Sequence, residues 1–331
     1  MIVGLEQAVQ ALREGEVVAL PTETVYGLGG IATKDVAVER IFRAKGRPRD
    51  NPLICHFFDA EHIRPFVESL PLYWEALVEA FSPGPVSYRL PLPSHSPLRP
   101  AVAGQSTVVC RIPDQPLCLE VIRQLQEPIA APSANTSGKV SPTTAMMVET
   151  DLGSEIAGVL DGGPCTYGLE STILDCCNST RITILRPGAI GTDEVADVLG
   201  RTGYGAVEVS YAEGAQQAVV PGSKYRHYAP DKLLLRVSSI DAIPTDRACV
   251  VLVSQEQWEE WEAQAWSNAV QPVVLGSRLE LSSVARELYQ NIKSLDDYTV
   301  GAAYYVEEDW GQSSLGRAIA NRLNRASEEK K

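Results

Sequence analysis

The sequence predicts an α/β protein made of two domains. Short apolar runs alternate with amphipathic stretches through residues 1–200, periodicity is lost from 201 to 230, and a second alternating series begins at Leu233. The chain of 331 residues is long enough for two domains, and its 44% hydrophobic content is ordinary for a protein with buried cores. We expect one domain at 1–205, a linker at 206–230 and a smaller domain at 231–331.

The first domain is expected to begin with a helix and to continue as mixed strands and helices. Helical apolar spacing ends at Gly15, and a helix beginning after Thr33 as N-cap leads into a cationic segment. The expected helices are Leu5–Glu14, Thr33–Ala44, Ala60–Ser69, Leu72–Phe81, Thr143–Asp151 and Thr192–Leu199, and the expected strands are Glu16–Leu20, Pro52–Phe58, Ser106–Ile112, Val159–Gly163, Ser171–Asp175 and Arg181–Leu185.

The second domain repeats a strand–helix pattern, which is typical of a mostly parallel, Rossmann-like sheet. No catalytic constellation stands out in it, and the tryptophans of its first helix are expected to pack in the core. Its expected strands are Leu233–Val237, Ala248–Ser254, Gln271–Leu275 and Val300–Val306, and its expected helices are Gln255–Trp266, Leu281–Ser294 and Ser313–Ala326.

Composition excludes several classes of protein. A formal charge of −13 argues against an extended nucleic-acid-binding surface. No apolar run approaches the roughly 18 residues of a membrane span, and the first fifteen residues indicate a helix and no signal peptide, so we expect a cytoplasmic protein. The seven cysteines are odd in number and include no C-x-x-C, which predicts that most are small core residues and that disulfides and a zinc site are absent.

A cationic segment dominates the first domain. Arg43, Lys45, Arg47 and Arg49 alternate along the chain before Asn51-Pro52. On an extended segment alternate side chains share one side, and converging Arg and Lys groups suit a polyphosphate. A solvated basic loop is the alternative for this segment alone.

Two further segments have the composition of ligand-binding loops. Residues 21–30, PTETVYGLGG, nominally contain a dinucleotide fingerprint, but Pro21 and three polar residues interrupt the strand that the fingerprint needs. A small-molecule pocket lining is favoured there. Residues 129–142, IAAPSANTSGKVSP, lack the Walker A spacing but offer short donors and backbone N–H groups for phosphate; a plain surface turn is the alternative.

Two strand residues and one later segment are further candidates for the functional site. His56 is the lone titratable group of its strand and Arg111 lies among apolar neighbours, where it needs an anionic partner. A core histidine and a structural ion pair are the alternatives. Residues 221–230, PGSKYRHYAP, carry more aromatic and cationic side chains than a spacer needs, which indicates a lid.

These motifs together resemble a known family. KGRPRDNPL, PTETVYGLG, APSAN followed by SGKVSPT, LESTILD, ILRPG and PGSKYRHYAP are similar to the two-domain YrdC-type threonylcarbamoyl-AMP synthases. The resemblance is dense over 1–200, includes the linker and is weaker over 231–331. It implies a YrdC-like open twisted sheet with a large basic cavity, followed by the smaller α/β domain.

The resemblance also implies a reaction and a set of site residues. Such enzymes join L-threonine, bicarbonate and ATP (with Mg²⁺) into threonylcarbamoyl-adenylate, release pyrophosphate, and supply a separate complex that modifies tRNA. The implied catalytic residues are Lys45, Arg47, Ser133 and Asn135; the implied ATP contacts are Arg47, Asn51, Thr107, Ser133, Ser141, Arg186 and His227; and the implied threonine contacts are Thr24, His56, Arg111 and Ser171. No protein metal site, stable nucleic-acid binding or membrane contact is expected.

Two other functions fit the same motifs. One is a noncatalytic RNA-binding or ribosome-associated module that uses the basic cavity, against which the acidic net charge and the few aromatics near the cations argue. The other is a carbamoyl transferase acting on a different amine, which only substrate trials separate from the first hypothesis.

Overall fold

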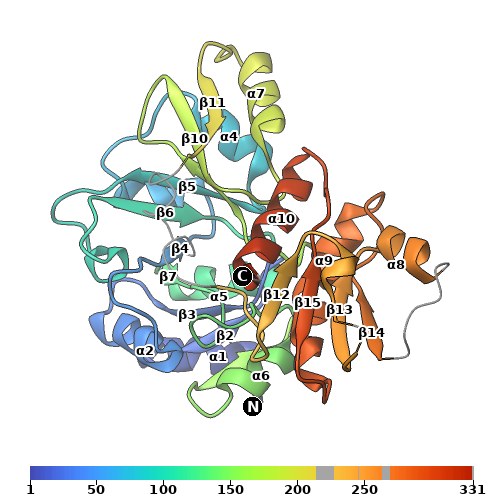
Figure 1. The fold of residues 1–331 in the computed structure, drawn as a ribbon. Helices are drawn as coiled ribbons and strands as arrows, with labels where there is room; N and C mark the ends of the chain where they lie inside the picture. Colours follow the sequence, from blue (N-terminus) through green and yellow to red (C-terminus); the bar gives the residue numbers. More distant parts are fainter. Residues whose placement is uncertain (214–226, 245, 263–268, 330–331) are drawn as a thin grey trace. The chain divides into compact units, whose positions relative to one another are not determined.

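The structure, a computed structural model, describes residues 1–213, 227–244, 246–262 and 269–329 (Figure 1). It divides into two compact units. The first contains Met1–Ser137 and residues 142–213, and the second contains Gly138–Ser141 and the described residues from 227 onward. Each unit has its own sheet covered by helices, which confirms the α/β class with a second, parallel-sheet domain.

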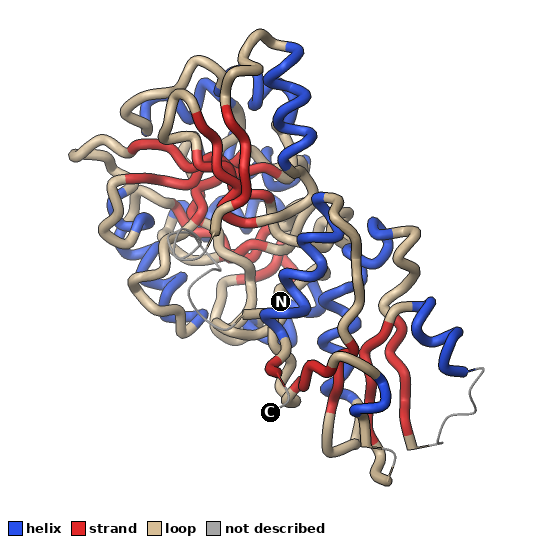
Figure 2. Tube along the Cα trace, turned by 45° about the horizontal axis from the view of Figure 1, so that its top comes forward, coloured by secondary structure: helices blue, strands red, loops and turns tan. Residues whose placement is uncertain are grey.

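The first unit is built on a mixed sheet of eleven strands in the order β1-β8-β2-β3-β7-β4-β6-β5-β9-β10-β11. Strands and helices interleave along the chain (Figure 2). The strands are β1 (Ile2–Val3), β2 (Val18–Leu20), β3 (Gly27–Ile31), β4 (Ile54–His56), β5 (Val86–Pro91), β6 (Thr107–Arg111), β7 (Ile129–Ala130), β8 (Gly158–Leu160), β9 (Thr172–Asp175), β10 (Arg181–Arg186) and β11 (Glu208–Tyr211). The α-helices are α1 (Leu5–Arg13), α2 (Asp35–Lys45), α3 (Ala60–Ile63), α4 (Trp74–Phe81), α5 (Pro116–Leu125), α6 (Ala145–Leu152) and α7 (Thr192–Arg201).

The two faces of this sheet are buried differently because strand residues alternate between them. The larger core combines one face with α2, α4, α6 and α7. On the other face, α1 and α5 cover the region of β2 and β7. Farther along that face, a small apolar cluster forms around Ile54, Val109, Ile173 and Leu185. His56 and Arg111 lie two residues beyond Ile54 and Val109, so they share this face.

Glycines of the segment 21–30 form a strand and no phosphate loop. Gly27–Ile31 is β3, which pairs antiparallel with β2. A Cβ at Gly29 would lie 2.8 Å from the Leu20 side chain, and one at Gly30 would lie 3.3 Å from the Ala37 carbonyl of α2. The glycines therefore permit close packing, and the dinucleotide fingerprint is excluded as the sequence suggested.

The cationic segment is not uniformly extended, which corrects the expectation from alternation. Helix α2 continues through Arg43 and Lys45 and ends at Gly46, whose φ of 57° suits a helix C-cap. Arg43 and Arg49 are exposed, and Arg49 forms an ion pair with Glu39. Only Lys45 and Arg47 are buried, at 1% and 7% exposure. Of the four alternating cations, only two are therefore placed inside the protein, and the other two face solvent.

Other expected boundaries shift by a few residues. Helix α2 begins at Asp35 with Lys34 as N-cap, and the Thr33 hydroxyl donates to Glu127. The helix expected at 60–69 is α3 followed by a 3₁₀ turn at Arg64–Phe66. The expected linker contains β11, which pairs parallel with β10. Residues 214–226, which include most of the expected lid, lie outside the described residues.

The second unit has a five-stranded sheet in the order β14-β13-β15-β12-β16, and its pairings are parallel. This confirms the parallel sheet expected from the sequence. Its strands are β12 (Leu234–Val237), β13 (Cys249–Val253), β14 (Val270–Val274), β15 (Ala303–Val306) and β16 (Glu328–Glu329), and its α-helices are α8 (Gln255–Glu262), α9 (Leu281–Ser294) and α10 (Ser314–Ala326).

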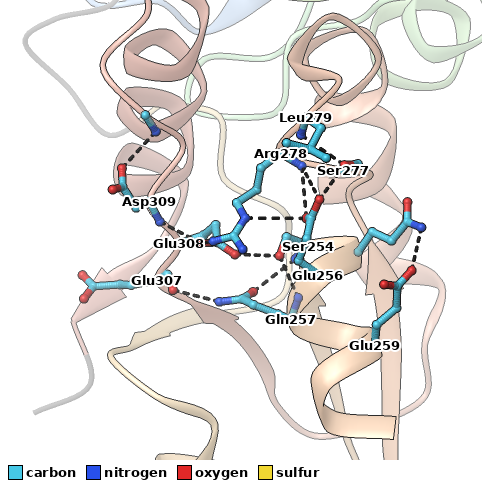
Figure 3. Close-up of polar contacts among 12 residues, drawn as sticks. Ser254, Glu256, Gln257, Glu259, Ser277, Arg278, Leu279, Glu307, Glu308 and Asp309 are labelled. Carbon is cyan, nitrogen blue, oxygen red and sulfur yellow. Dashed lines mark hydrogen bonds and ion pairs between the residues drawn. The ribbon is translucent and has the colours of Figure 1, made fainter. Parts of the chain in front are cut away.

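A polar network joins the carboxyl ends of β13, β14 and β15 (Figure 3). The Ser254 hydroxyl donates to the Glu308 carboxylate at 2.6 Å, and Arg278 donates to the same carboxylate at 3.0 Å. Glu256 accepts from the Ser277 hydroxyl at 2.5 Å. Since Glu308 is 6% exposed, this network stabilises a buried charge at the strand ends.

The second unit also holds the described end of the expected lid, residues 227–230. Lys139 forms an ion pair with Asp231, and the Ala229 N–H donates to the Gly138 carbonyl at 3.1 Å. Tyr228 stacks on Tyr289 with ring centroids 5.4 Å apart. The chain is therefore anchored on this unit immediately after 227.

Composition also raised expectations about membrane spans and cysteines. Among the helices of the described residues, none combines the length and apolar character needed to cross a bilayer. All seven cysteines are free thiols, and six of them are buried, with Cys177 the exposed one.

Candidate active site

Lys45 joins the end of α2 to the 133–137 loop. Its ammonium donates to the backbone carbonyls of Ser133 and Asn135, and its own carbonyl accepts from the Ser137 N–H at 2.8 Å. Burial holds the pKa of Lys45 well below its ordinary 10.5, and the neighbouring Arg47 charge lowers that pKa further, while Asp151 opposes the shift. An anion beside this ammonium would stabilise its charged form.

Arg47 closes the turn that leads into β4. Its Nε donates to the Asn51 carbonyl at 3.1 Å and its Nη2 donates to the Pro52 carbonyl at 2.8 Å. Asn51 is 2% exposed. These contacts fix the guanidinium on the turn, with its charge near Lys45, and two such cations can together bind a polyphosphate.

The Ser133–Asn135 loop is fixed from two sides. Ser133 forms an isolated antiparallel bridge with Gly27, and the Ala134 N–H donates to the Tyr26 carbonyl at 2.8 Å. On the other side, the Thr136 N–H and hydroxyl both donate to Asp151 of α6 at 2.8 Å. The structure thus brings the Lys45 ammonium to the backbone of Ser133 and Asn135.

Four residues expected at threonine form a connected group. Nη1 of Arg111 donates to the Thr24 hydroxyl at 2.8 Å, and Arg111 is the register neighbour of His56 on β4. On the other side, Ser87 of β5 pairs with Arg111 in register, and the Ser87 and Ser171 hydroxyls are 2.7 Å apart. The group spans β4, β6 and β5 and the residue before β9.

His56 lies in this group as a neutral imidazole. Burial lowers the pKa of His56 to about 3, and the Arg111 charge contributes to the lowering. Its Nδ1 is buried and has no hydrogen-bond partner among the described residues. At neutral pH it therefore offers an uncharged ring to a ligand on this face of the sheet.

Arg186 links the predicted ATP and threonine contacts. Its Nε donates to the Ser171 carbonyl and its Nη2 to the Ser171 hydroxyl, both at 3.0 Å. Arg186 is 8% exposed and Ser171 is fully buried. One buried cation therefore lies within hydrogen-bond distance of a residue expected to contact the amino acid.

Two of the predicted ATP contacts lie at the opposite end of two parallel strands from the predicted threonine contacts. Asn51 precedes β4 and Thr107 begins β6, whereas His56 and Arg111 end these strands. At about 3.3 Å per residue, the five residues of β6 span ~13 Å between Thr107 and Arg111. The Thr107 hydroxyl accepts from Arg89 at 3.1 Å. Ser141 and His227 belong to the second unit.

The structure adds three residues that sequence reasoning left without a role. Glu23 accepts from Arg111 Nη2 at 2.6 Å, and both side chains are 4% exposed. Ser87 connects Arg111 to Ser171, and Asp151 holds the 133–137 loop. Glu23 was visible only as part of a polar strand end, and the separation of 88 residues from Arg111 gives no local signal of their pairing.

Two family models account for most of the chain. Residues 10–188 match the Sua5/YciO/YrdC model, described as "Telomere recombination", and residues 190–328 match the model described as "Threonylcarbamoyl-AMP synthase, C-terminal domain". The threonylcarbamoyl-AMP synthase of Bacillus subtilis (strain 168) is 38% identical over 98% of this chain and 92% of that protein. The enzyme of that name from Pyrococcus abyssi is 36% identical over 96% of this chain and 92% of that protein.

A solved structure agrees with these matches. The crystal structure of P. abyssi Sua5 complexed with L-threonine superposes with a TM-score of 0.82, at 34% identity, and covers 98% of this chain and 94% of that one. Escherichia coli YciO shares the fold of part of the chain, with a TM-score of 0.51 at 20% identity. The two domains, the full-length relatives and the motifs agree, and the chain belongs to the threonylcarbamoyl-AMP synthase family.

Proposed function

We propose that this chain condenses L-threonine, bicarbonate and ATP into threonylcarbamoyl-adenylate and pyrophosphate by means of the residues described above. The observation that carries this assignment of roles is the burial of Lys45 and Arg47, with the Lys45 ammonium bonded to the Ser133–Asn135 loop. The family membership supports the reaction, and the P. abyssi structure with L-threonine supports threonine as the amino acid.

The reaction needs alignment of anions more than proton transfer. Threonine's ammonium first loses a proton, and the free amine condenses with bicarbonate to form a carbamate and water. A carbamate oxygen then bonds to the α-phosphorus of ATP while the bond to the pyrophosphate oxygen breaks. Positioned cations and donors lower such a barrier by orientation and charge neutralisation. In this chain Lys45 and Arg47 hold the phosphates, and Ser133 and Asn135 hold oxygens on which charge develops.

The remaining assignments give ATP and threonine separate sets of contact residues. We assign Asn51, Thr107, Ser141, Arg186 and His227 to ATP. Thr24, His56, Arg111 and Ser171 take threonine, whose carboxylate needs a cation such as Arg111. His227 belongs to residues 221–230, for which we keep the role of a lid that excludes water from a readily hydrolysed product.

Magnesium would enter with the nucleotide. The described residues contain no group of three or more His, Cys, Asp or Glu side chains placed to hold a metal ion. Bound to ATP, the ion would be held mainly by phosphate oxygens, where its charge helps to neutralise the triphosphate. The protein cations Lys45 and Arg47 would share that neutralisation.

The product defines the next step. A threonylcarbamoyl-adenylate is an activated acyl donor, so a separate transfer complex would pass the threonylcarbamoyl group to an adenosine of tRNA. We expect this in the cytoplasm and without stable binding of nucleic acid by this chain, whose net charge is −13.

The direct test measures pyrophosphate release and identifies the adenylate by mass spectrometry. Purified full-length protein is incubated with ATP, Mg²⁺, threonine and bicarbonate. The assay is then repeated once without threonine and once without bicarbonate. Both omissions should abolish release. Release with another amine but not with threonine would favour a different carbamoyl transferase, and salt-sensitive tRNA binding without any release would favour the RNA-binding alternative.

A further inference from the structure

Glu23 carries a buried carboxylate oxygen without a partner. The residue lies between β2 and β3 and is 4% exposed. Its Oε1 accepts from Arg111 Nη2 at 2.6 Å. Its Oε2 is also buried, and no hydrogen-bond donor among the described residues reaches it. An ionised carboxylate oxygen removed from water requires a donor, so this atom points to a ligand that supplies one.

The neighbouring guanidinium is only partly used by the protein. Arg111 donates through Nη2 to Glu23, through Nη1 to Thr24 and, at 3.4 Å, through Nε to the Gly84 carbonyl. A guanidinium has five N–H groups, so these three bonds leave two donors. Arg111 can therefore bind an anionic group while it keeps Glu23 in place.

Glu23 and Arg111 bring opposite charges together as a buried ion pair. Their partners on either side, Thr24 and the neutral His56, add no net charge. A free α-amino acid likewise carries a carboxylate and an ammonium on one carbon. If the amino acid lies with its carboxylate on Arg111, its ammonium comes next to the carboxylate that already contacts Arg111.

We propose that Oε2 of Glu23 binds the α-amino group of the substrate threonine while Arg111 binds its carboxylate. This inference rests on the proposed function and extends it by naming the acceptor for the reacting nitrogen. The bound charges then alternate in sign, and each is paired. For the reaction the ammonium gives up one proton to solvent, and the amine condenses with bicarbonate and releases water. The carbamate nitrogen keeps one N–H, which continues to donate to Glu23 and holds the carbamate oxygens toward the nucleotide.

Threonine has a second donor, the β-hydroxyl, and the two possibilities predict different results. An acceptor for the amine should affect every α-amino acid and spare ligands without an amine. An acceptor for the hydroxyl should affect threonine and spare 2-aminobutyrate, which lacks that group. A residue that only supports Arg111 should weaken all carboxylate ligands alike.

The test is calorimetry of threonine, 2-aminobutyrate and 3-hydroxybutyrate binding to the full chain and to Glu23→Gln. Glutamine keeps an acceptor for Arg111 and replaces the second oxygen with an NH₂ group. We expect threonine and 2-aminobutyrate to lose about 10- to 100-fold in affinity, because a charge-assisted bond is lost. The affinity for 3-hydroxybutyrate should change by less than about 3-fold.

Matched controls separate the outcomes. Glu127→Gln alters a half-buried carboxylate that accepts from Thr33 at 2.9 Å, and it should bind all three ligands like wild type. Equal losses for all ligands in Glu23→Gln, a loss for threonine alone, or no loss at all would each overturn the proposal. Absence of threonine-dependent pyrophosphate release by the wild type would instead contradict the proposed function.

Discussion

The ammonium of Lys45 donates to the backbone carbonyl of Asn135, which joins the last residue of α2 to a loop 90 residues farther along the chain. Both side chains are buried, at 1% and 4% exposure. The contact places a cation that is costly to bury beside an amide and a second cation, Arg47. Two buried cations this close together need an anionic ligand to balance their charge.

ATP binding should therefore depend on pH through Lys45. Burial lowers the pKa of this ammonium, so it loses its proton at a lower pH than an exposed lysine would. The charged form binds phosphate, and ATP affinity should fall as pH rises through the lowered pKa. In Lys45→Arg the guanidinium stays charged, and that decline should disappear. Titration of ATP affinity from pH 6 to 9.5 checks this; parallel curves for both proteins would contradict it.

Asp151 should act on nucleotide binding from outside the site. It accepts two bonds from Thr136 at 2.8 Å and so holds the 133–137 loop. Asp151→Ala removes both, and we expect KM for ATP to rise about 10-fold, since each such bond contributes about 1 kcal/mol. KM for threonine should stay within about 2-fold. Steady-state kinetics measure both constants, and an equal rise in both would show a general loss of structure.

His56 should make the protein less stable in acid. Its pKa is about 3 in the folded state and 6.5 as the ordinary value for an unfolded chain. Below pH 6.5 the unfolded state takes up a proton that the folded state refuses, so the free energy of unfolding falls as pH falls. The loss attributable to His56 should approach about 1.4 kcal/mol per pH unit between pH 6 and 4.

Urea denaturation of wild type and His56→Gln at pH 7 and pH 5 checks this prediction. The variant has no imidazole at this position and should lose less stability between the two values. His95→Gln, which removes an exposed histidine, should follow the wild type. Identical losses in wild type and His56→Gln would contradict the assignment of a neutral, buried ring.

The polar network of the second unit should matter for stability and not for the reaction. Arg278→Ala leaves the buried Glu308 carboxylate with the Ser254 hydroxyl as a side-chain donor. The free energy of unfolding should fall by about 1–3 kcal/mol. Arg286→Ala, which removes an exposed ion pair with Glu287 at 4.0 Å, should change it by less than about 0.5 kcal/mol. Denaturant titration distinguishes the two, and equal effects would contradict the structural role.

The elements with strong periodicity could be predicted from sequence, and the second unit shows this well. The strand expected at 248–254 is β13, Cys249–Val253, and the helix expected at 281–294 is α9. The cationic segment was harder, because alternation of charges suggested extension while α2 continued to Lys45. Gly46 at positive φ was the local signal of that helix end.

The candidate site could be predicted in part, for a physical reason. Residue type and motif identified Lys45, Ser133 and Asn135 as candidates. In the structure the Lys45 ammonium donates to the backbone carbonyls of the other two. The partner of Arg111 could not be predicted, because a contact between residues 23 and 111 depends on the order of β2, β3, β4 and β6 in the sheet. Glu23 therefore had no role until the fold was known.

The central claim is that the two buried cations of the 43–49 segment, and not its exposed ones, act on ATP. Threonine- and bicarbonate-dependent pyrophosphate release should be measured for wild type, Lys45→Ala, Arg47→Ala and the matched control Arg49→Ala, whose side chain is 71% exposed. We expect a loss of at least about 100-fold in the first two variants and less than about 3-fold in the control. Wild-type rates in Lys45→Ala or Arg47→Ala, with all chains folded, would contradict the account.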